Sequence, residues 1–269
     1  KTKSLHGTVV SFFLVTATIP TLNPSLRIER RQRMVSQVSR RFYMEARVEL
    51  AEGGYAVTLD GRSVRTPSGT QVVILSSRLA DAIADEWAEQ KEEIVLASMP
   101  LTQLAVTAID RVGPGRAEVI NNIARYGATD LLCYRAEAPA DLVRQQEELW
   151  QPLLDWVAKI YGARLQVTFG IIHTVQEESA LVALRAAVNR HNDFELTALA
   201  EMTQICSSVV IGLAVMAGHI APETAFETSL LDETWQSEQW GSDFDAEARR
   251  AAIRSDLQSA ARFIDLLRD

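Results

Sequence analysis

The chain has 269 residues, of which 47% are hydrophobic and 23% are charged, and its formal net charge is −8. This composition is typical of a globular protein and excludes collagen-like, low-complexity and wholly disordered classes. The length allows one large domain or two of modest size.

Basic residues are concentrated at the N-terminus. Between Lys1 and Arg41 there are eight basic residues and one acidic residue, a local net charge of 8 − 1 = +7. The rest of the chain has 19 basic and 34 acidic residues, a net charge of 19 − 34 = −15. Because phosphate backbones are bound by basic surfaces, we expect no nucleic-acid partner.

Residues 1–40 are predicted to be a tail outside the fold. Residues 9–19 are an apolar run similar to the hydrophobic part of a signal peptide, whereas the Arg-rich, acid-poor stretch that follows is more like an organellar presequence. A third interpretation is an over-extended reading frame with its start at Met34.

Residues 41–78 are predicted to form a small antiparallel β-rich domain. Three short segments are rich in Val, Ile, Tyr and Thr, and turn residues separate them at Gly53-Gly54, at Asp60-Gly61 and around Gly69. This pattern predicts three or four strands.

Residues 79–269 are predicted to be helical, because the hydrophobic period changes to 3.6 after Ser76 and Ser77. Leu79, Ile83 and Trp87 fall on one face of the first helix. Further helices are predicted over residues 116–125, after Pro139 with a kink at Pro152, and over 177–190, 193 to about 217, 222–239 and 244–267. The fold class is therefore α+β with helix dominant: a small β-rich N-terminal part followed by a larger helical part.

Residues 202–220 contain no Asp, Glu, Lys or Arg and are long enough to be considered as a membrane span. They include Thr203, Gln204 and His219, and amphipathic acidic helices flank them, which favours a buried core helix and no stable membrane insertion. Cys133 and Cys206 lie in apolar runs far apart, so we expect two buried reduced thiols.

Catalytic and metal-binding motifs are missing from the sequence. It has no phosphate loop, no dinucleotide fingerprint, no nucleophile elbow and no paired-histidine zinc motif. The four His residues are scattered, so we expect no metal site, no cofactor and no catalytic residues. A chain rich in packing residues and poor in catalytic groups favours protein binding over enzymatic turnover.

The C-terminal stretch from Leu230 to Gly241 combines large aromatic side chains with carboxylates and amides, a mixture typical of protein interfaces. Its spacing leaves open whether the two Trp residues belong to the core. The predicted partner-binding residues are Asp232, Glu233, Trp235, Gln236, Glu238 and Trp240.

Several segments, in this order from about Arg41 to the C-terminus, match a known family. They are RRFYMEARVE, GGYAVTLDGRSVRTP, the Ala84 to Gln90 run, MPLT at 99–102, TDLLCYR at 129–135, the run from Trp150 to Trp156, and Trp235-Gln236 with Trp240-Gly241. Together they resemble the family of assembly chaperones for the alpha subunit of the ATP synthase catalytic head.

The resemblance implies a non-enzymatic function, in which the protein holds the free alpha subunit, prevents its aggregation and hands it over for assembly of the alpha-beta hexamer. It also implies that an acidic position in the C-terminal helical region matters, and Glu233 is our first choice among Asp232, Glu233 and Glu238. The family occurs in mitochondria and bacteria, so we expect a monomer in the bacterial cytoplasm or, alternatively, in the mitochondrial matrix.

Two other interpretations stay open. The first is a small-molecule enzyme of unrecognised type that uses Asp60, Arg62 and Asp130 in a cleft between the β-rich and helical parts. The second is a membrane-anchored subunit that uses residues 202–220.

Overall fold

The computed structural model describes residues 39–170, 172–241 and 244–268. Contacts between residues divide the chain into unit 1, which ends at Asp110, and unit 2, which begins at Arg111. Unit 1 therefore contains the strands of the predicted β-rich domain together with the first two helices. The predicted tail lies outside the described residues, apart from Ser39 and Arg40, which form strand β1.

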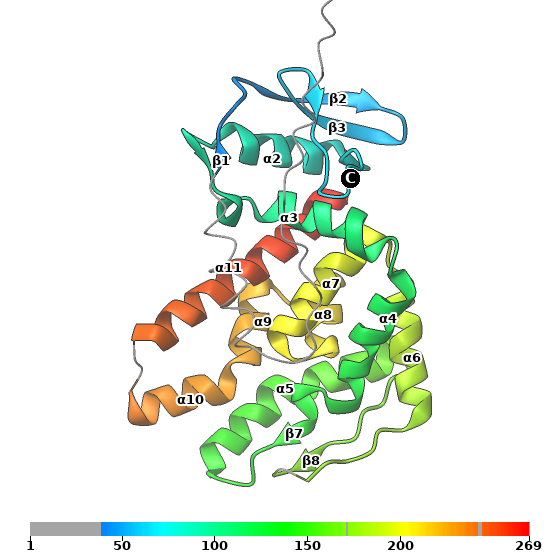
Figure 1. Ribbon diagram of the computed structural model, residues 1–269. Helices are drawn as coiled ribbons and strands as arrows, with labels where there is room; N and C mark the ends of the chain where they lie inside the picture. Colours follow the sequence, from blue (N-terminus) through cyan, green and yellow to red (C-terminus); the bar gives the residue numbers. More distant parts are fainter. Residues whose placement is uncertain (1–38, 171, 242–243, 269) are drawn as a thin grey trace, which may run out of the picture. The chain divides into compact units, whose positions relative to one another are not determined.

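Unit 1 is a small antiparallel sheet with a helix packed on one face (Figure 1). The four-stranded sheet has the order β2-β3-β4, with β5 also paired to β3, and β1 pairs with β6. This confirms the predicted strands. The elements are β1 (Ser39–Arg40), β2 (Ala46–Ala51), β3 (Gly54–Leu59), β4 (Arg62–Ser63), β5 (Val73–Ile74), α2 (Ser77–Ala88), β6 (Glu93–Ile94) and α3 (Pro100–Thr107), and a π-helix follows at Ala108–Val112.

Two turns of unit 1 explain residues that the sequence analysis marked. Asp60 and Gly61 have φ of 49° and 74° and connect β3 to β4, as the Asp-Gly pair predicts. Gly54 tolerates no side chain, because a Cβ atom there would lie 2.3 Å from the carbonyl oxygen of Ile74. The carboxylate of Asp60 accepts the backbone N–H groups of Met44 and Glu45, which fixes the chain leading into β2.

A buried carboxylate joins the two helices of unit 1. Glu86, on α2, accepts hydrogen bonds from the N–H groups of Leu101 and Thr102, at 2.8 Å each, and from the hydroxyl of Thr102 at 2.7 Å. These groups are in the first turn of α3, where backbone donors have no partner within the helix. Two of the segments that carry the family resemblance therefore form one helix cap. The run around Glu86 supplies the acceptor, and MPLT supplies the donors.

Unit 2 is a helical bundle with one short parallel strand pair (Figure 1). Its elements are α4 (Arg116–Arg125), β7 (Tyr134–Arg135), α5 (Ala140–Tyr161), β8 (Thr168–Phe169), α6 (Glu178–Asn189), α7 (Asp193–Cys206), α8 (Val209–Met216), α9 (Pro222–Ser229), α10 (Leu231–Trp240) and α11 (Phe244–Leu267). The predicted helix-dominant α+β class is confirmed, and Pro152 lies inside α5.

The apolar run at residues 202–220 does not form the single helix predicted from 193 to about 217. It divides at Ser207, whose φ of 50° ends α7, and Ser208 caps α8 by accepting the N–H of Ile211. All eight residues of α8 are buried, and α5, α7, α9 and α11 contact it. Gly212 brings α8 close to α7, because a Cβ atom there would lie 2.8 Å from the Thr203 hydroxyl oxygen.

The predicted core role of this run is confirmed. Over the described part of the chain, no helix has the length and apolar character that crossing a membrane requires. Cys133 and Cys206 are buried free thiols, as expected, and burial together with the nearby Asp130 carboxylate raises the pKa of Cys133 to about 12.

Asp130 explains why the chain breaks before α8. Its carboxylate is fully buried and accepts the N–H groups of Val210, in the first turn of α8, and of Leu132, both at 3.2 Å. Desolvation raises the pKa of Asp130 to about 6, although hydrogen bonds from Ser208 and the backbone oppose this rise. One carboxylate therefore holds both the start of α8 and the segment that leads to β7.

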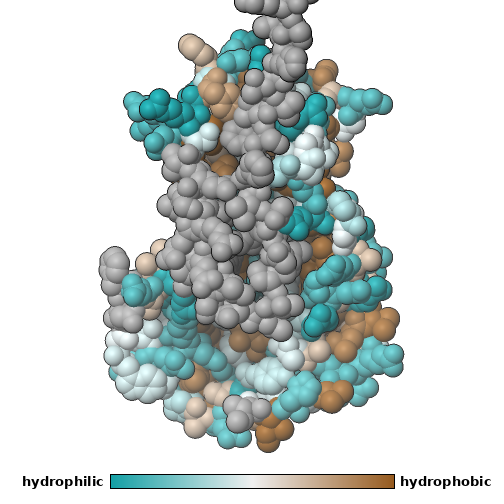
Figure 2. Space-filling view, in the orientation of Figure 1, coloured by the Kyte–Doolittle hydropathy of each residue, from teal (hydrophilic) through white to brown (hydrophobic). Residues whose placement is uncertain are grey.

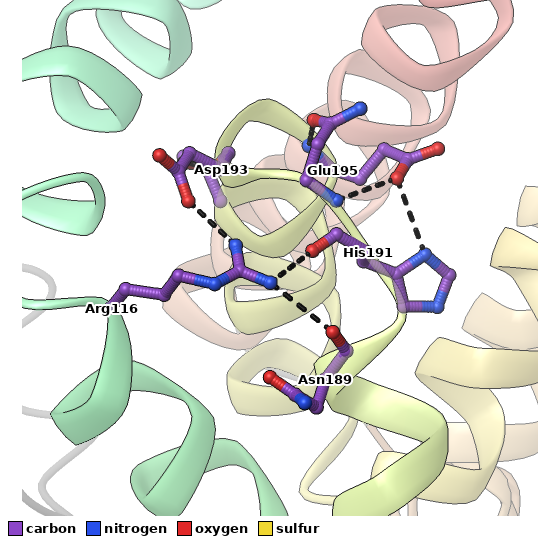
Figure 3. A network of polar contacts seen from close by, with 7 residues as sticks. Arg116, Asn189, His191, Asp193 and Glu195 are labelled. Carbon is purple, nitrogen blue, oxygen red and sulfur yellow. Dashed lines mark hydrogen bonds and ion pairs between the residues drawn. The ribbon is translucent and has the colours of Figure 1, made fainter.

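A second polar cluster joins α4 to the turn between α6 and α7 (Figure 3). The guanidinium of Arg116 donates to the carbonyl oxygens of Asn189 and His191 and to the Asp193 carboxylate, the last at 2.6 Å. It thereby satisfies carbonyls at the C-terminal end of α6. The Nδ1 atom of His191 lies 3.6 Å from a carboxylate oxygen of Glu195, and burial lowers the His191 pKa.

Asp130 gives unit 2 a specific pH dependence. Its pKa is about 4 when unfolded and about 6 when folded, so the folded protein binds this proton more tightly. Its contribution to the free energy of unfolding is therefore largest below about pH 4 and is lost as the pH rises through about 6, a change of roughly 3 kcal/mol. The Asp130→Asn variant should lack this contribution. Urea unfolding of both proteins across this pH range checks it, and a constant difference between them would contradict it.

Candidate functional site

Helix α10 contains the predicted partner-binding residues and is attached to unit 2 in an unusual way. Only Leu231 among its ten residues is buried. The predicted helix over residues 222–239 is wrong at its centre, because α9 ends at Ser229 and Leu230 has φ −108° and ψ 17°. Leu230 and Leu231 are both buried at this break, which changes the course of the chain. With so little apolar burial, polar bonds must hold α10 in place.

Two of these bonds connect α10 to α5, which lies beside it in Figure 1. The Asp232 carboxylate accepts a hydrogen bond from the buried Gln146 amide at 2.7 Å, and the Trp235 indole N–H donates to Asp141 at 3.0 Å. The Trp235 hydrogen bond lowers the pKa of Asp141, so the acceptor stays ionised. Asp232 and Trp235 therefore face α5.

The Asp232 bond ends a hydrogen-bonded path that begins at Asp130. Leu132 donates its N–H to Asp130, and its carbonyl accepts from the Arg135 guanidinium at 2.9 Å. Arg135 is buried and also donates to the carbonyl of Gln146 at 2.8 Å, while Gln146 donates its side-chain amide to Asp232. The TDLLCYR segment thus links the start of α8 to α10.

Further bonds connect α10 to α11. The Glu233 carboxylate lies 2.5 Å from the Arg249 guanidinium and 3.8 Å from that of Arg250. Arg250 also donates to the Thr234 hydroxyl at 2.8 Å. Its guanidinium is also 5.6 Å from the ring centroid of Phe226, on α9. Glu233 therefore faces the two arginines of α11.

The outer surface of α10 carries the other predicted residues. Gln236, Glu238 and Trp240 are exposed, with 77% of Trp240 accessible to solvent. The Trp240 ring meets the half-buried Trp235 ring edge to face, with centroids 5.9 Å apart. Neither Trp is a core residue, which decides the question that spacing left open. We define the α10 surface as Gln236 and Trp240, which are one helical turn apart on the same face, whereas Glu238 is exposed on the other side of the helix.

The residues that hold α10 were not predicted from the sequence. Asp141, Gln146, Arg249 and Arg250 lie 16 to 94 positions away from their α10 partners. The pair Arg249-Arg250, in an otherwise acidic C-terminal region, was the one available signal. Contacts between distant positions on different helices leave no periodic pattern in a single sequence.

Two of the three residues proposed for an enzyme, Asp60 and Asp130, have structural roles in their own units, and Arg62 lies in β4. Asp60 binds the backbone at the start of β2, and Asp130 caps α8. Among the residues that the structure describes, no group of three or more His, Cys, Asp or Glu is arranged to hold a metal ion.

A second exposed feature of unit 2 is apolar. Figure 2 shows hydrophobic surface over α6 and along β8. The side chains that are more than half exposed there are Phe169, Ile172, Val175 and Val182.

Known proteins resemble this chain along most of its length. Residues 40–158 match the family model described as ATP12 chaperone protein. The crystal structure of Atp12 from Paracoccus denitrificans is 42% identical, with 86% of this chain and 99% of that one covered and a TM-score of 0.82. A solved protein from Agrobacterium tumefaciens is 35% identical, with coverages of 91% and 92% and a TM-score of 0.82. Protein atp12, mitochondrial, from Schizosaccharomyces pombe is 27% identical to this chain, and the aligned region covers 94% of this chain and 87% of that protein.

Replacing Gln146 tests how α10 is attached. Gln146→Leu keeps the side-chain volume but removes the acceptor of the Ala136 N–H and the donor to Asp232. We expect the free energy of unfolding to fall by about 1–3 kcal/mol, because partly buried polar groups lose their partners. Urea unfolding measures this, with Gln145→Leu as the neighbouring control on α5. Equal stabilities of the two variants would contradict the proposed attachment.

Proposed function

The chain belongs to the ATP12 chaperone family, the assembly chaperones of ATP synthase, and we propose that its partner is the free alpha subunit of the catalytic head. It binds this subunit before the alpha-beta hexamer forms, prevents its aggregation and releases it when the beta subunit arrives. An unassembled subunit exposes the apolar surface that its neighbours later cover, and such surfaces aggregate.

The observation that supports this proposal is the α10 surface. It presents an exposed tryptophan one helical turn from an exposed amide, a combination of aromatic and polar groups typical of binding hot spots and their rims. All six predicted partner-binding residues lie on this one helix: Asp232, Glu233, Trp235, Gln236, Glu238 and Trp240. We therefore place the binding of the alpha subunit on α10, with Trp240 as the main apolar contact.

The proposal includes no catalytic step and no cofactor. Related proteins come from mitochondria and from bacteria. We propose that the chain acts where the alpha subunit is assembled, in the bacterial cytoplasm or in the mitochondrial matrix.

A pull-down tests the choice of partner. The full chain is mixed with separately expressed alpha and beta subunits of the ATP synthase head, and soluble complex is scored for each. We expect capture of alpha and not of beta. Capture of neither, with both subunits folded, would overturn the proposal, and capture of beta alone would assign the wrong partner.

Trp240→Ala tests the place of binding. The change removes a large exposed side chain, so the fold should keep its stability, whereas capture of alpha should weaken roughly tenfold, or by about 1–2 kcal/mol. Phe169→Ala is the matched control, because it removes another exposed aromatic ring from unit 2 and should leave capture unchanged. The dissociation constants are measured by titration. A loss in the Phe169 variant alone would move the binding site to β8.

A further inference from the structure

The carboxylate of Glu233 is directed at α11 and is partly shielded from solvent. Its side chain is 28% exposed, and the Oε1 atom is buried without a hydrogen bond in the described structure. The Nη1 atom of Arg250 faces this oxygen at 3.8 Å and is also buried without a hydrogen bond in the described structure. The other contact of this carboxylate is Arg249, at 2.5 Å. No oxygen of Glu233 therefore points away from the helix pair as the exposed carboxylate of Glu238 does.

The charges lead to the same conclusion. Two arginines surround one carboxylate, so this cluster has a local net charge of 2 − 1 = +1. A cluster with this charge does not attract a basic group of a partner. The exposed acidic side chain of α10 is Glu238.

The position of α10 depends on this cluster, because α10 buries only Leu231. On the α5 side it has the bonds of Asp232 and Trp235, and on the α11 side those of Glu233 and Thr234. Loss of either set leaves the helix attached along one side. Reversal of the charge at residue 233 would go further and set three positive groups against one another.

We propose that Glu233 is a positioning residue, which fixes α10 on α11 through Arg249 and Arg250 so that Trp240 is presented to the partner. The proposal rests on the binding function placed on α10. It assigns to Glu233 a contact within the chain, where the sequence predicted a contact with the partner.

A charge exchange tests this role. Glu233→Lys and Arg249→Glu should each weaken capture of the alpha subunit about tenfold, since coupled residues of one ion-pair network commonly show effects of this size. The double variant, Glu233→Lys with Arg249→Glu, should recover capture to within about threefold of the wild type. If the double variant is as stable as the wild type but captures no better than Glu233→Lys, Glu233 contacts the partner directly and the proposal is overturned.

Arg254→Glu is the matched control. Arg254 is on the same helix, is 48% exposed compared with 42% for Arg249, and pairs with Glu223 of α9 at 3.0 Å. Its reversal breaks a similar ion pair that does not involve α10, so capture should stay within about twofold of the wild type. A tenfold loss in this control would show that the net charge of α11 matters, which would overturn the specific role of Glu233.

Hydrogen exchange separates this inference from the choice of partner, because it needs no alpha subunit. Glu233→Lys should speed exchange of the α10 amides, and the double variant should slow it again. Unchanged α10 exchange in Glu233→Lys would overturn the positioning role even if the wild type captures alpha. If the wild type captures no subunit but hydrogen exchange in the two variants changes as expected, Glu233 positions α10 and the proposed function is wrong. Should Glu233→Lys not fold, Glu233→Gln removes the charge alone and is compared in the same way.

Discussion

The first turn of α8 is the position on which unit 2 depends. A helix buried on every side presents its first N–H groups to a region without water, and each needs an acceptor. Asp130 and Ser208 supply these acceptors. Burial of a carboxylate is costly, as the raised pKa of Asp130 indicates, but the backbone donors and the positive end of the α8 dipole offset part of that cost. The break in the apolar run at Ser207 lets α8 start where that carboxylate lies.

Hydrogen bonds connect the same carboxylate to α10, which is largely exposed. Asp130 orders the segment of Leu132, whose carbonyl holds the Arg135 guanidinium; Arg135 binds Gln146, and Gln146 binds Asp232. A path of directional bonds connects the core to a helix that has almost no apolar packing of its own. Such a helix is easier to displace than a packed one, because each of its bonds can be exchanged for a bond to water. This property suits the proposed function, in which the surface binds a partner and later releases it.

The sequence predicted most of the fold because most elements have a local signal. The Asp60-Gly61 pair indicated a hairpin, and the predicted limits of α4 and α11 agree with the structure to the residue. The two helix breaks, at Ser207 and at Leu230, were not predicted. The first depends on Asp130, which is far from α8 in the sequence, and the second depends on burial of two successive leucines. Both causes are tertiary, and a periodic pattern contains neither.

The contacts of the candidate site were also beyond prediction from a periodic pattern, because they too are tertiary. Composition indicated one helix, α10, as the candidate site, because it combines large aromatic side chains with carboxylates and amides. Composition does not predict the direction of each side chain. Asp232, Glu233 and Trp235 bind α5 and α11. Gln236, Glu238 and Trp240 are exposed. Burial of one tryptophan contributes about 2–3 kcal/mol, whereas a stable subunit interface buries about 1,600 Å². Under the proposed function, a capture surface centred on one ring would be weaker than the contact between the subunits, as release on arrival of the beta subunit requires.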